Sequence, residues 1–188
     1  MGHTMLRQLL CATLLASGLA ARAFSQSSTT IVIVVRHAEK ATAPASDPPL
    51  TDSGVARAKA LASALLDANV QAVISTALVR TRETARPTAE SRGLTIETVP
   101  LAPIADHAKA VADAVRKHMG QTVLVVGHSN TVGAIIAALG GPRTPNLCES
   151  QYSNLYTLVL DRGATTLIRG SYGAPSPDPP TGCPSEVK

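Results

Sequence analysis

The sequence predicts a three-layer α/β/α sandwich in which helices cover both faces of a mostly parallel central sheet. Residues 31–35 and 122–126 are short apolar, largely β-branched runs, typical of central strands that are buried on both faces. Segments with helical periodicity separate these runs from further predicted strands, and this alternation indicates parallel strands joined by crossover helices. The 188 residues suffice for one domain with a full core.

The first half of the chain is predicted to hold three strands and two helices. Thr51 and the residues after it offer capping groups for the first helix, and Pro87 is expected to kink the second helix or to end it early. The third strand is more polar, which suits the edge of a sheet. The predicted elements are a strand at 31–35, a helix with its apolar stripe over 55–66, a strand at 70–75, a helix at 78–91 and a strand at 94–99.

The second half is predicted to continue the alternation and to end in a β-hairpin. Gly120 ends its first helix, and the sequence Asp-Arg-Gly-Ala at 161–164 is a turn between two late strands. The predicted elements are a helix at 105–119, a strand at 122–126, a helix at 130–139 and strands at 155–160 and 165–170.

Residues 1–23 have the three parts of a secretory signal peptide. Arg7 lies in a short n-region, an apolar run follows over residues 9–21, and Ala21-Arg22-Ala23 is an A-x-A-like cleavage site. A membrane anchor is the alternative, but the apolar run is shorter than the roughly 20 residues of a spanning helix. We therefore expect cleavage after Ala23 or Ser25, no stable membrane anchor afterwards, and a periplasmic or secreted protein.

Two cysteines, Cys148 and Cys183, remain after removal of the signal peptide. An even pair in an exported chain favours a disulfide, with two unpaired thiols as the alternative. The bond would join a proline-rich C-terminal tail, 174–188, to the globular domain expected over 24–173.

Charge and composition argue against a nucleic-acid partner. The formal net charge is +4 and aromatic residues make up 2% of the chain, so neither a polybasic surface nor a stacking platform for bases is predicted. We expect a small ligand instead. The sequence indicates no particular oligomeric state.

Each of the two central strands is followed by a histidine. Arg36 and His37 follow the first strand and His128 follows the second, so the carboxyl ends of parallel strands are expected to bring them to one edge of the sheet. Taken alone, a histidine at the end of a strand is as readily a structural residue as a functional one. Arg36, however, offers a planar fork of donors for phosphate oxygens, and its charge lowers the pKa of a neighbouring imidazole. Arg80, near a helix N-terminus, adds to the attraction for an anion. A phosphoryl group is the predicted ligand.

Four segments together resemble motifs of the histidine phosphatase superfamily, whose fold is phosphoglycerate mutase-like. The resemblance runs from about residue 31 to 160 and fits the compact branch 1 of the family. Ala38 stands where the family usually has glycine, and Ala77 stands where the family often has proline. The segments are RHAEK at 36–40 (an RHG-type motif), DPPLTDSG at 47–54 (D-x-x-L-T-x-x-G), STALVRTRETA at 75–85 (SSPLxRAxQTA) and GHSN at 127–130 (the GH motif of the second histidine).

The resemblance implies that His37 is a nucleophile that becomes phosphohistidine. Arg36, Arg80 and His128 would form the anion pocket, while Arg82 matches a variable position of the motif. Fixed cationic donors stabilise the charge of a phosphoryl group in transfer, so no metal or other cofactor is expected.

The general acid is expected on the segment after the third strand, where the family places a carboxylate. Asp106 is our choice, although it has a competing interpretation as the N-cap of the following helix. Glu97 and Glu39 are the alternatives. His107 and His118 are expected to be surface residues of that helix.

The predicted function is therefore a metal-independent phosphomonoesterase of the cell envelope acting on a small phosphorylated substrate. A phosphoglycerate mutase-like phosphotransferase is an alternative, but it needs a phosphodonor pool normally found in the cytoplasm. A second alternative is a metal enzyme whose ligands are His37, His128, Asp106 and Glu39. The charges of Arg36 and Arg80 argue against it, because they would repel the cation. A non-catalytic module that binds phospho-ligands is the third. The sequence does not identify the substrate.

Overall fold

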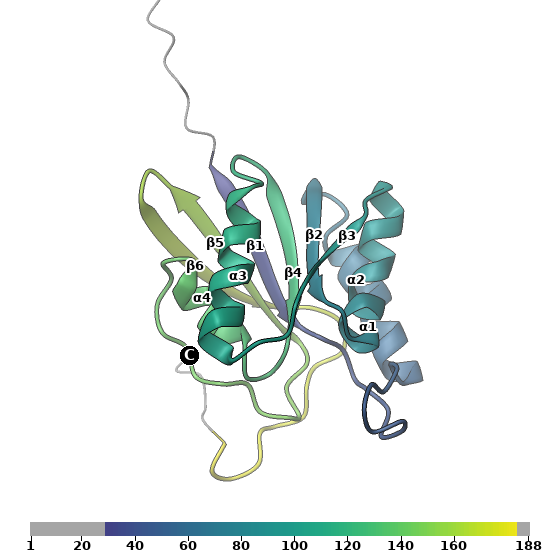
Figure 1. Ribbon diagram of the computed structural model, residues 1–188. Helices are drawn as coiled ribbons and strands as arrows, with labels where there is room; N and C mark the ends of the chain where they lie inside the picture. Colours follow the sequence, from purple (N-terminus) through teal and green to yellow (C-terminus); the bar gives the residue numbers. More distant parts are fainter. Residues whose placement is uncertain (1–28, 184–188) are drawn as a thin grey trace, which may run out of the picture.

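The six strands of the described part of the chain form one mixed sheet in the order β3-β2-β4-β1-β5-β6. The computed structural model describes residues 29–183, so the predicted signal peptide lies outside the described residues. Strands β3, β2, β4 and β1 are mutually parallel, and the β5–β6 hairpin pairs antiparallel to β1 (Figure 1). The strands are β1 (Thr30–Arg36), β2 (Val70–Thr76), β3 (Ile96–Val99), β4 (Thr122–Gly127), β5 (Asn154–Asp161) and β6 (Ala164–Ser171).

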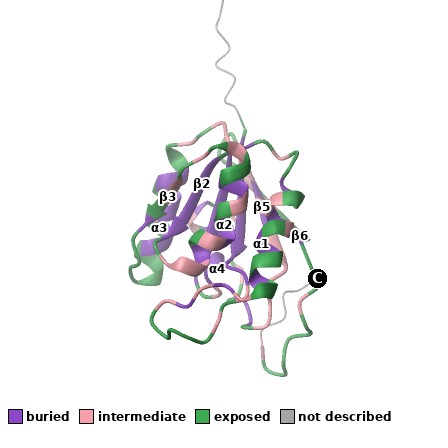
Figure 2. Cartoon of the chain, turned by 90° about the vertical axis from the view of Figure 1, so that its right-hand side faces the viewer, coloured by how far each residue is buried: buried purple, intermediate pink, exposed green. Residues whose placement is uncertain are grey.

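Two helices cover each face of the sheet, as the three-layer prediction requires. Side chains of β1 alternate between the two faces: Val32 and Val34 pack with α3 and α4, while Ile33 and Val35 pack with α1 and α2. Figure 2 shows the buried strands between helices whose outer faces are exposed. The helices are α1 (Asp52–Ala64), α2 (Val79–Arg92), α3 (Ile104–Arg116) and α4 (Val132–Ala138). None of the helices within residues 29–183 is long and apolar enough to cross a membrane.

Local sequence signals account for most element boundaries. The Thr51 side chain accepts from the Gly54 amide at the start of α1. Arg162 and Gly163 both have positive φ, 46° and 84°, as a two-residue hairpin turn requires. The edge position of β3 and the hairpin are confirmed.

Helix α2 matches the predicted range and runs past Pro87, whereas helix α4 begins later than predicted. Helix α2 does not end at Pro87, because buried Thr84, Ala85, Thr88 and Ala89 hold both sides of it against the core. Helix α4 begins at Val132 and not at residue 130, because the Thr131 hydroxyl accepts from the His128 amide and closes a turn before the helix.

The predicted pairing of Cys148 with Cys183 is confirmed: a disulfide joins them, with Cα atoms 6.0 Å apart. The tail is also held by Ser176, whose hydroxyl accepts from the amides of Tyr152 (2.8 Å) and Ser153 (2.9 Å). The tail therefore lies against the loop that connects α4 to β5.

Candidate active site

The two predicted site histidines lie side by side at the carboxyl edge of the sheet. Arg36 is in register with Gly127 on the adjacent strand, and the His37 amide donates to the Gly127 carbonyl at 2.9 Å. His37 and His128 therefore leave neighbouring strands at the same level, and their ring centroids are 5.4 Å apart. Both rings are buried, and both line a cavity of about 460 Å³. Parallel pairing of β1 and β4 thus brings together residues about 90 positions apart.

The His37 ring is held in one tautomer. Its Nδ1 lies 2.8 Å from the carbonyl oxygen of Ala38, and a carbonyl can only accept, so Nδ1 carries the proton. The lone pair is then on Nε2, which no described residue contacts by a hydrogen bond. This is the form of imidazole that can attack an electrophile.

Both histidines are neutral at physiological pH. Burial lowers the pKa of His37 to about 3, and the charges of Arg36 and Arg80 add to this effect, which the hydrogen bond to Ala38 only partly offsets. Burial and the charge of Arg80 lower the pKa of His128 to about 4. The two rings can therefore lie close together without mutual charge repulsion.

Two threonine hydroxyls, from Thr76 at the end of β2 and Thr81 in α2, orient His128. Thr81 Oγ1 donates to the Leu78 carbonyl at 2.8 Å, so the 2.8 Å contact between the two threonine hydroxyls requires Thr76 to donate to Thr81. Thr76 Oγ1 then accepts from His128 Nε2 at 3.2 Å. This chain fixes the plane of the His128 ring.

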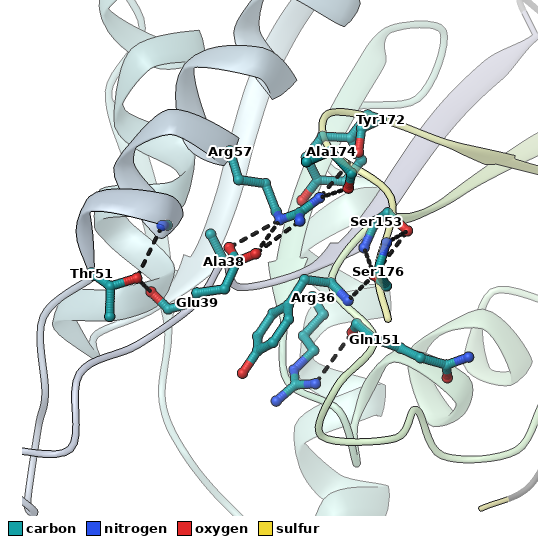
Figure 3. Close-up of polar contacts among 12 residues, drawn as sticks. Arg36, Ala38, Glu39, Thr51, Arg57, Gln151, Ser153, Tyr172, Ala174 and Ser176 are labelled. Atoms are coloured by element: carbon teal, nitrogen blue, oxygen red, sulfur yellow. Dashed lines mark hydrogen bonds and ion pairs between the residues drawn. The ribbon is translucent and has the colours of Figure 1, made fainter. Parts of the chain in front are cut away.

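The Arg36 guanidinium lies almost fully buried beneath the loop between α4 and β5. Its Nη1 donates to the carbonyls of Cys148 (2.8 Å) and Gln151 (3.2 Å), its Nη2 pairs with Glu149 at 2.6 Å, and it stacks on Tyr152 with Cζ 4.2 Å from the ring centroid. Figure 3 shows the bond to Gln151. The rigid fork is thus held in one orientation beside His37.

Arg80 lies in the first turn of α2 and lines the cavity. Asp47 fixes it: the carboxylate accepts from the Val79 amide at 3.0 Å, which caps the helix, and lies 3.7 Å from the Arg80 guanidinium. The Nε–H groups of both Arg36 and Arg80 are buried without a hydrogen-bond partner in the described part of the chain. An anion bound beside His37 would offer them oxygen acceptors.

The cavity does not contain the carboxylates that the sequence suggested for proton transfer. Asp106 is exposed in the first turn of α3 and is absent from the cavity lining, and its side chain does not cap the helix. Glu97 on the edge strand pairs with Lys117 (3.0 Å) and His118 (3.2 Å). The one carboxylate among the described residues lining the cavity is Glu149.

Glu39 takes part in a structural ion pair with Arg57. Both of its oxygens accept from Arg57 at 2.8–2.9 Å, and Arg57 Nη1 donates to the carbonyls of Tyr172 and Ala174 (Figure 3). This nearly buried ion pair connects the segment after His37 to the C-terminal tail. The four ligands considered for a metal enzyme are therefore not brought together, and no cluster of three such groups occurs within residues 29–183.

The prediction of His107 as a surface residue was wrong. His107 is 1% exposed and lines the cavity, because α3 turns it toward the sheet together with Ala108, Val111 and Ala112. Its Nδ1 lies 3.0 Å from the Pro100 carbonyl, and its buried Nε2 has no described partner. Its place on the apolar stripe of the helix was the signal that could have revealed this.

The architecture is that of the phosphoglycerate mutase-like fold, as solved structures show. The chain matches the protein histidine phosphatase SixA complexed with tungstate, with a TM-score of 0.61 and 22% identity over 75% of this chain and 96% of that one. It matches phosphoglycerate mutase from Bacillus anthracis with a TM-score of 0.60 and 17% identity over 76% and 92%. It matches a phosphoserine phosphatase mutant from Entamoeba histolytica in complex with phosphoserine with a TM-score of 0.55 and 15% identity, over 76% of this chain and 96% of that one. At these identities the likeness shows the shared fold.

The family follows from the sequence match. The model of the histidine phosphatase superfamily (branch 1) matches residues 3–101, more than half of the chain. The chain therefore belongs to the histidine phosphatase superfamily, branch 1. No curated protein sequence matches it.

Proposed function

We propose that the protein is a metal-independent phosphomonoesterase that forms a phosphohistidine on His37. The observation that carries this proposal is the free, neutral Nε2 of His37 in a cavity that also holds His128 and Arg80. A nucleophile, cationic donors and a fixed second imidazole are the groups that a phosphoryl transfer requires.

The geometry supports a reaction in two half-reactions. His37 Nε2 attacks phosphorus, the N–P bond forms and the ester P–O bond breaks. The guanidinium groups of Arg36 and Arg80 stabilise the charge on the equatorial oxygens, and their unpaired Nε–H groups are available for this. Water then attacks phosphorus, the N–P bond breaks and inorganic phosphate leaves.

We further propose that the enzyme works in the cell envelope after cleavage of residues 1–23. The disulfide between Cys148 and Cys183 supports this location, because such bonds persist in oxidising compartments. Hydrolysis fits an exported enzyme better than a mutase reaction does, because a mutase depends on phosphodonors of the cytoplasm. Mass spectrometry of the N-terminus after expression in a bacterial host tests the cleavage: an intact Met1 would contradict it.

The covalent mechanism is tested with p-nitrophenyl phosphate and a chelator. The parent protein should release nitrophenolate in the presence of EDTA, and an alkaline denaturing quench during turnover should trap an acid-labile, base-stable phosphoryl group that peptide mapping places on His37. His37→Ala should lose at least about 10³-fold in kcat, because the nucleophile is removed. Equal rates for the two proteins, or loss of activity with EDTA, would exclude this mechanism. Conversion of one phosphoglycerate isomer to the other would favour the mutase.

A further inference from the structure

We propose that Glu149 is the proton-transfer residue of the site: it protonates the leaving oxygen and then deprotonates the attacking water. The inference rests on the proposed phosphohistidine mechanism and deepens it. Hydrolysis of an alkyl ester requires such a group, because an alkoxide is a poor leaving group without a proton.

The position of Glu149 is the first argument. It lines the cavity with His37 and His128, and its side chain is 74% exposed, so it projects into the open part of the cavity. Its Oε2 lies 2.6 Å from Arg36 Nη2 and its Oε1 lies 2.7 Å from Ser129 Oγ. Because Arg36 precedes one site histidine and Ser129 follows the other, the carboxylate spans the ends of β1 and β4 at the place where the phosphoryl group would bind.

The loop that carries Glu149 is anchored on both sides, which is the second argument. The Leu147 amide donates to the Ser129 carbonyl at 2.9 Å, and the Cys148 carbonyl accepts from Arg36. The disulfide fixes Cys148 to the tail, and the Cys148 amide donates to the Gln151 side chain at 3.2 Å. Preorganised groups of this kind are what proton transfer in a transition state requires.

The charge of Glu149 determines where its proton comes from. Partial burial would raise its pKa, but the hydrogen bond from Ser129 and the charge of Arg36 outweigh this and lower the pKa below the usual value, so the carboxylate is ionised in the free protein. A phosphoryl group beside Arg36 places like charge next to it, which favours the protonated form. The substrate therefore supplies the proton by binding as its monoanion.

The complete cycle then balances. The substrate monoanion gives its proton to Glu149 as it binds. His37 Nε2 attacks phosphorus, the ester P–O bond breaks, and Glu149 returns the proton to the leaving oxygen, which departs as an alcohol. The Glu149 carboxylate next accepts a proton from water, the oxygen of that water attacks phosphorus, and the N–P bond breaks. Glu149 finally returns this proton to the departing phosphate.

The experiment compares two esters that differ in their need for an acid. Glycerol 2-phosphate has an alkoxide leaving group, whereas p-nitrophenolate leaves without a proton. Glu149→Gln should lower kcat/KM for glycerol 2-phosphate about 10²- to 10⁴-fold. With p-nitrophenyl phosphate it should keep a burst of about one nitrophenolate per enzyme, followed by slow turnover and accumulation of phosphohistidine, because only dephosphorylation then lacks its base.

Two further variants make the result specific. Glu90→Gln is the matched control, since Glu90 is exposed in the last turn of α2, far along the helix from Arg80, and both rates should stay within about twofold. Asp106→Asn tests the carboxylate that the sequence suggested. Selective loss on glycerol 2-phosphate in Asp106→Asn and not in Glu149→Gln would overturn the proposal.

The remaining outcomes also decide the question. An equal loss on both esters in Glu149→Gln, without a burst, would mean that Glu149 only positions Arg36. Unchanged or faster turnover of both would mean that Glu149 is an internal anion that competes with substrate. Either result overturns the proposal while the parent protein still forms phosphohistidine. Absence of phosphohistidine in the parent would instead contradict the proposed function.

Discussion

The Nδ1 proton of His37, donated to the carbonyl of the adjacent Ala38, keeps the reactive nitrogen unprotonated. The bond raises the pKa of His37, and burial and the charge of Arg36 lower it more strongly. A lowered pKa keeps the ring neutral, and the fixed tautomer directs its lone pair away from the backbone. These two effects leave the Nε2 lone pair available for the nucleophilic role that we propose for His37.

This burial makes stability depend on pH. Below pH 6.5 His37 and His128 bind protons in the unfolded chain but stay neutral in the folded one, down to pKa values of about 3 and about 4. The unfolded state thus binds more protons, so the free energy of unfolding should fall as pH falls from 6.5, by up to about 1.4 kcal/mol per pH unit for each histidine.

Urea denaturation at pH 7.5, 6.5, 5.5 and 4.5 measures this slope. The His37→Gln variant has no imidazole at this position. The decrease in its free energy of unfolding per pH unit between pH 6.5 and 4.5 should therefore be smaller by about the contribution of one histidine. Glu97 and Glu149, whose pKa values are lowered in the folded protein, also begin to cost stability near pH 4.5, because the unfolded chain binds protons there, and this contribution is common to both proteins. The same slope in both proteins would contradict the buried, neutral state of His37.

At the scale of elements, the strands were predictable from the sequence. The contacts that loops and helix ends make with other elements were not. Apolar runs identified β1 and β4, and the rule that parallel strands share an edge predicted that His37 and His128 would meet. The start of α1 is different. Its Gly54 is buried against the Glu39 carbonyl and Leu50, a contact that depends on tertiary packing and has no local sequence signal beyond the motif.

Gly54→Ala should therefore push α1 away from the segment that follows His37. A Cβ atom at this position would overlap with the Glu39 carbonyl, which is backbone and cannot rotate away. Overpacking of this kind costs about 1–3 kcal/mol, and a lower turnover number should accompany the loss, because Glu39 is only two residues from His37. Thermal unfolding and p-nitrophenyl phosphate turnover measure the two effects.

Gly170→Ala is the control for this substitution. Gly170 lies on β6 and a Cβ atom there would have its nearest neighbour at 3.9 Å, which is ordinary contact. Its melting temperature and turnover should match those of the parent. Equal melting temperatures for the two variants would mean that α1 adjusts to the extra methyl group without cost.

At the scale of the whole molecule, the C-terminal tail holds two segments that border the site, the segment after His37 and the loop that carries Glu149. Arg57 connects Glu39 to the Tyr172 and Ala174 carbonyls, and the disulfide connects the tail to Cys148. The count of cysteines predicted the disulfide. Glu149 was not predicted as a site residue because it lies in an irregular loop that has no periodicity. It is 113 positions from Arg36 in the sequence, and only folding brings the two side chains into contact.

Removal of the disulfide should therefore affect both stability and the site. Cys183→Ser opens a loop with a sequence separation of 35 residues, and the chain-entropy model gives a loss of roughly 3–4 kcal/mol in the free energy of unfolding. The Cys148 carbonyl and Glu149 then hold Arg36 less firmly, so KM for p-nitrophenyl phosphate should rise. Urea denaturation and steady-state kinetics, each with and without dithiothreitol, measure these changes. The reductant should shift the parent toward the variant and leave Cys183→Ser unchanged; a parent that keeps its KM under full reduction would show that the tail contacts of Ser176 alone hold the loop in place.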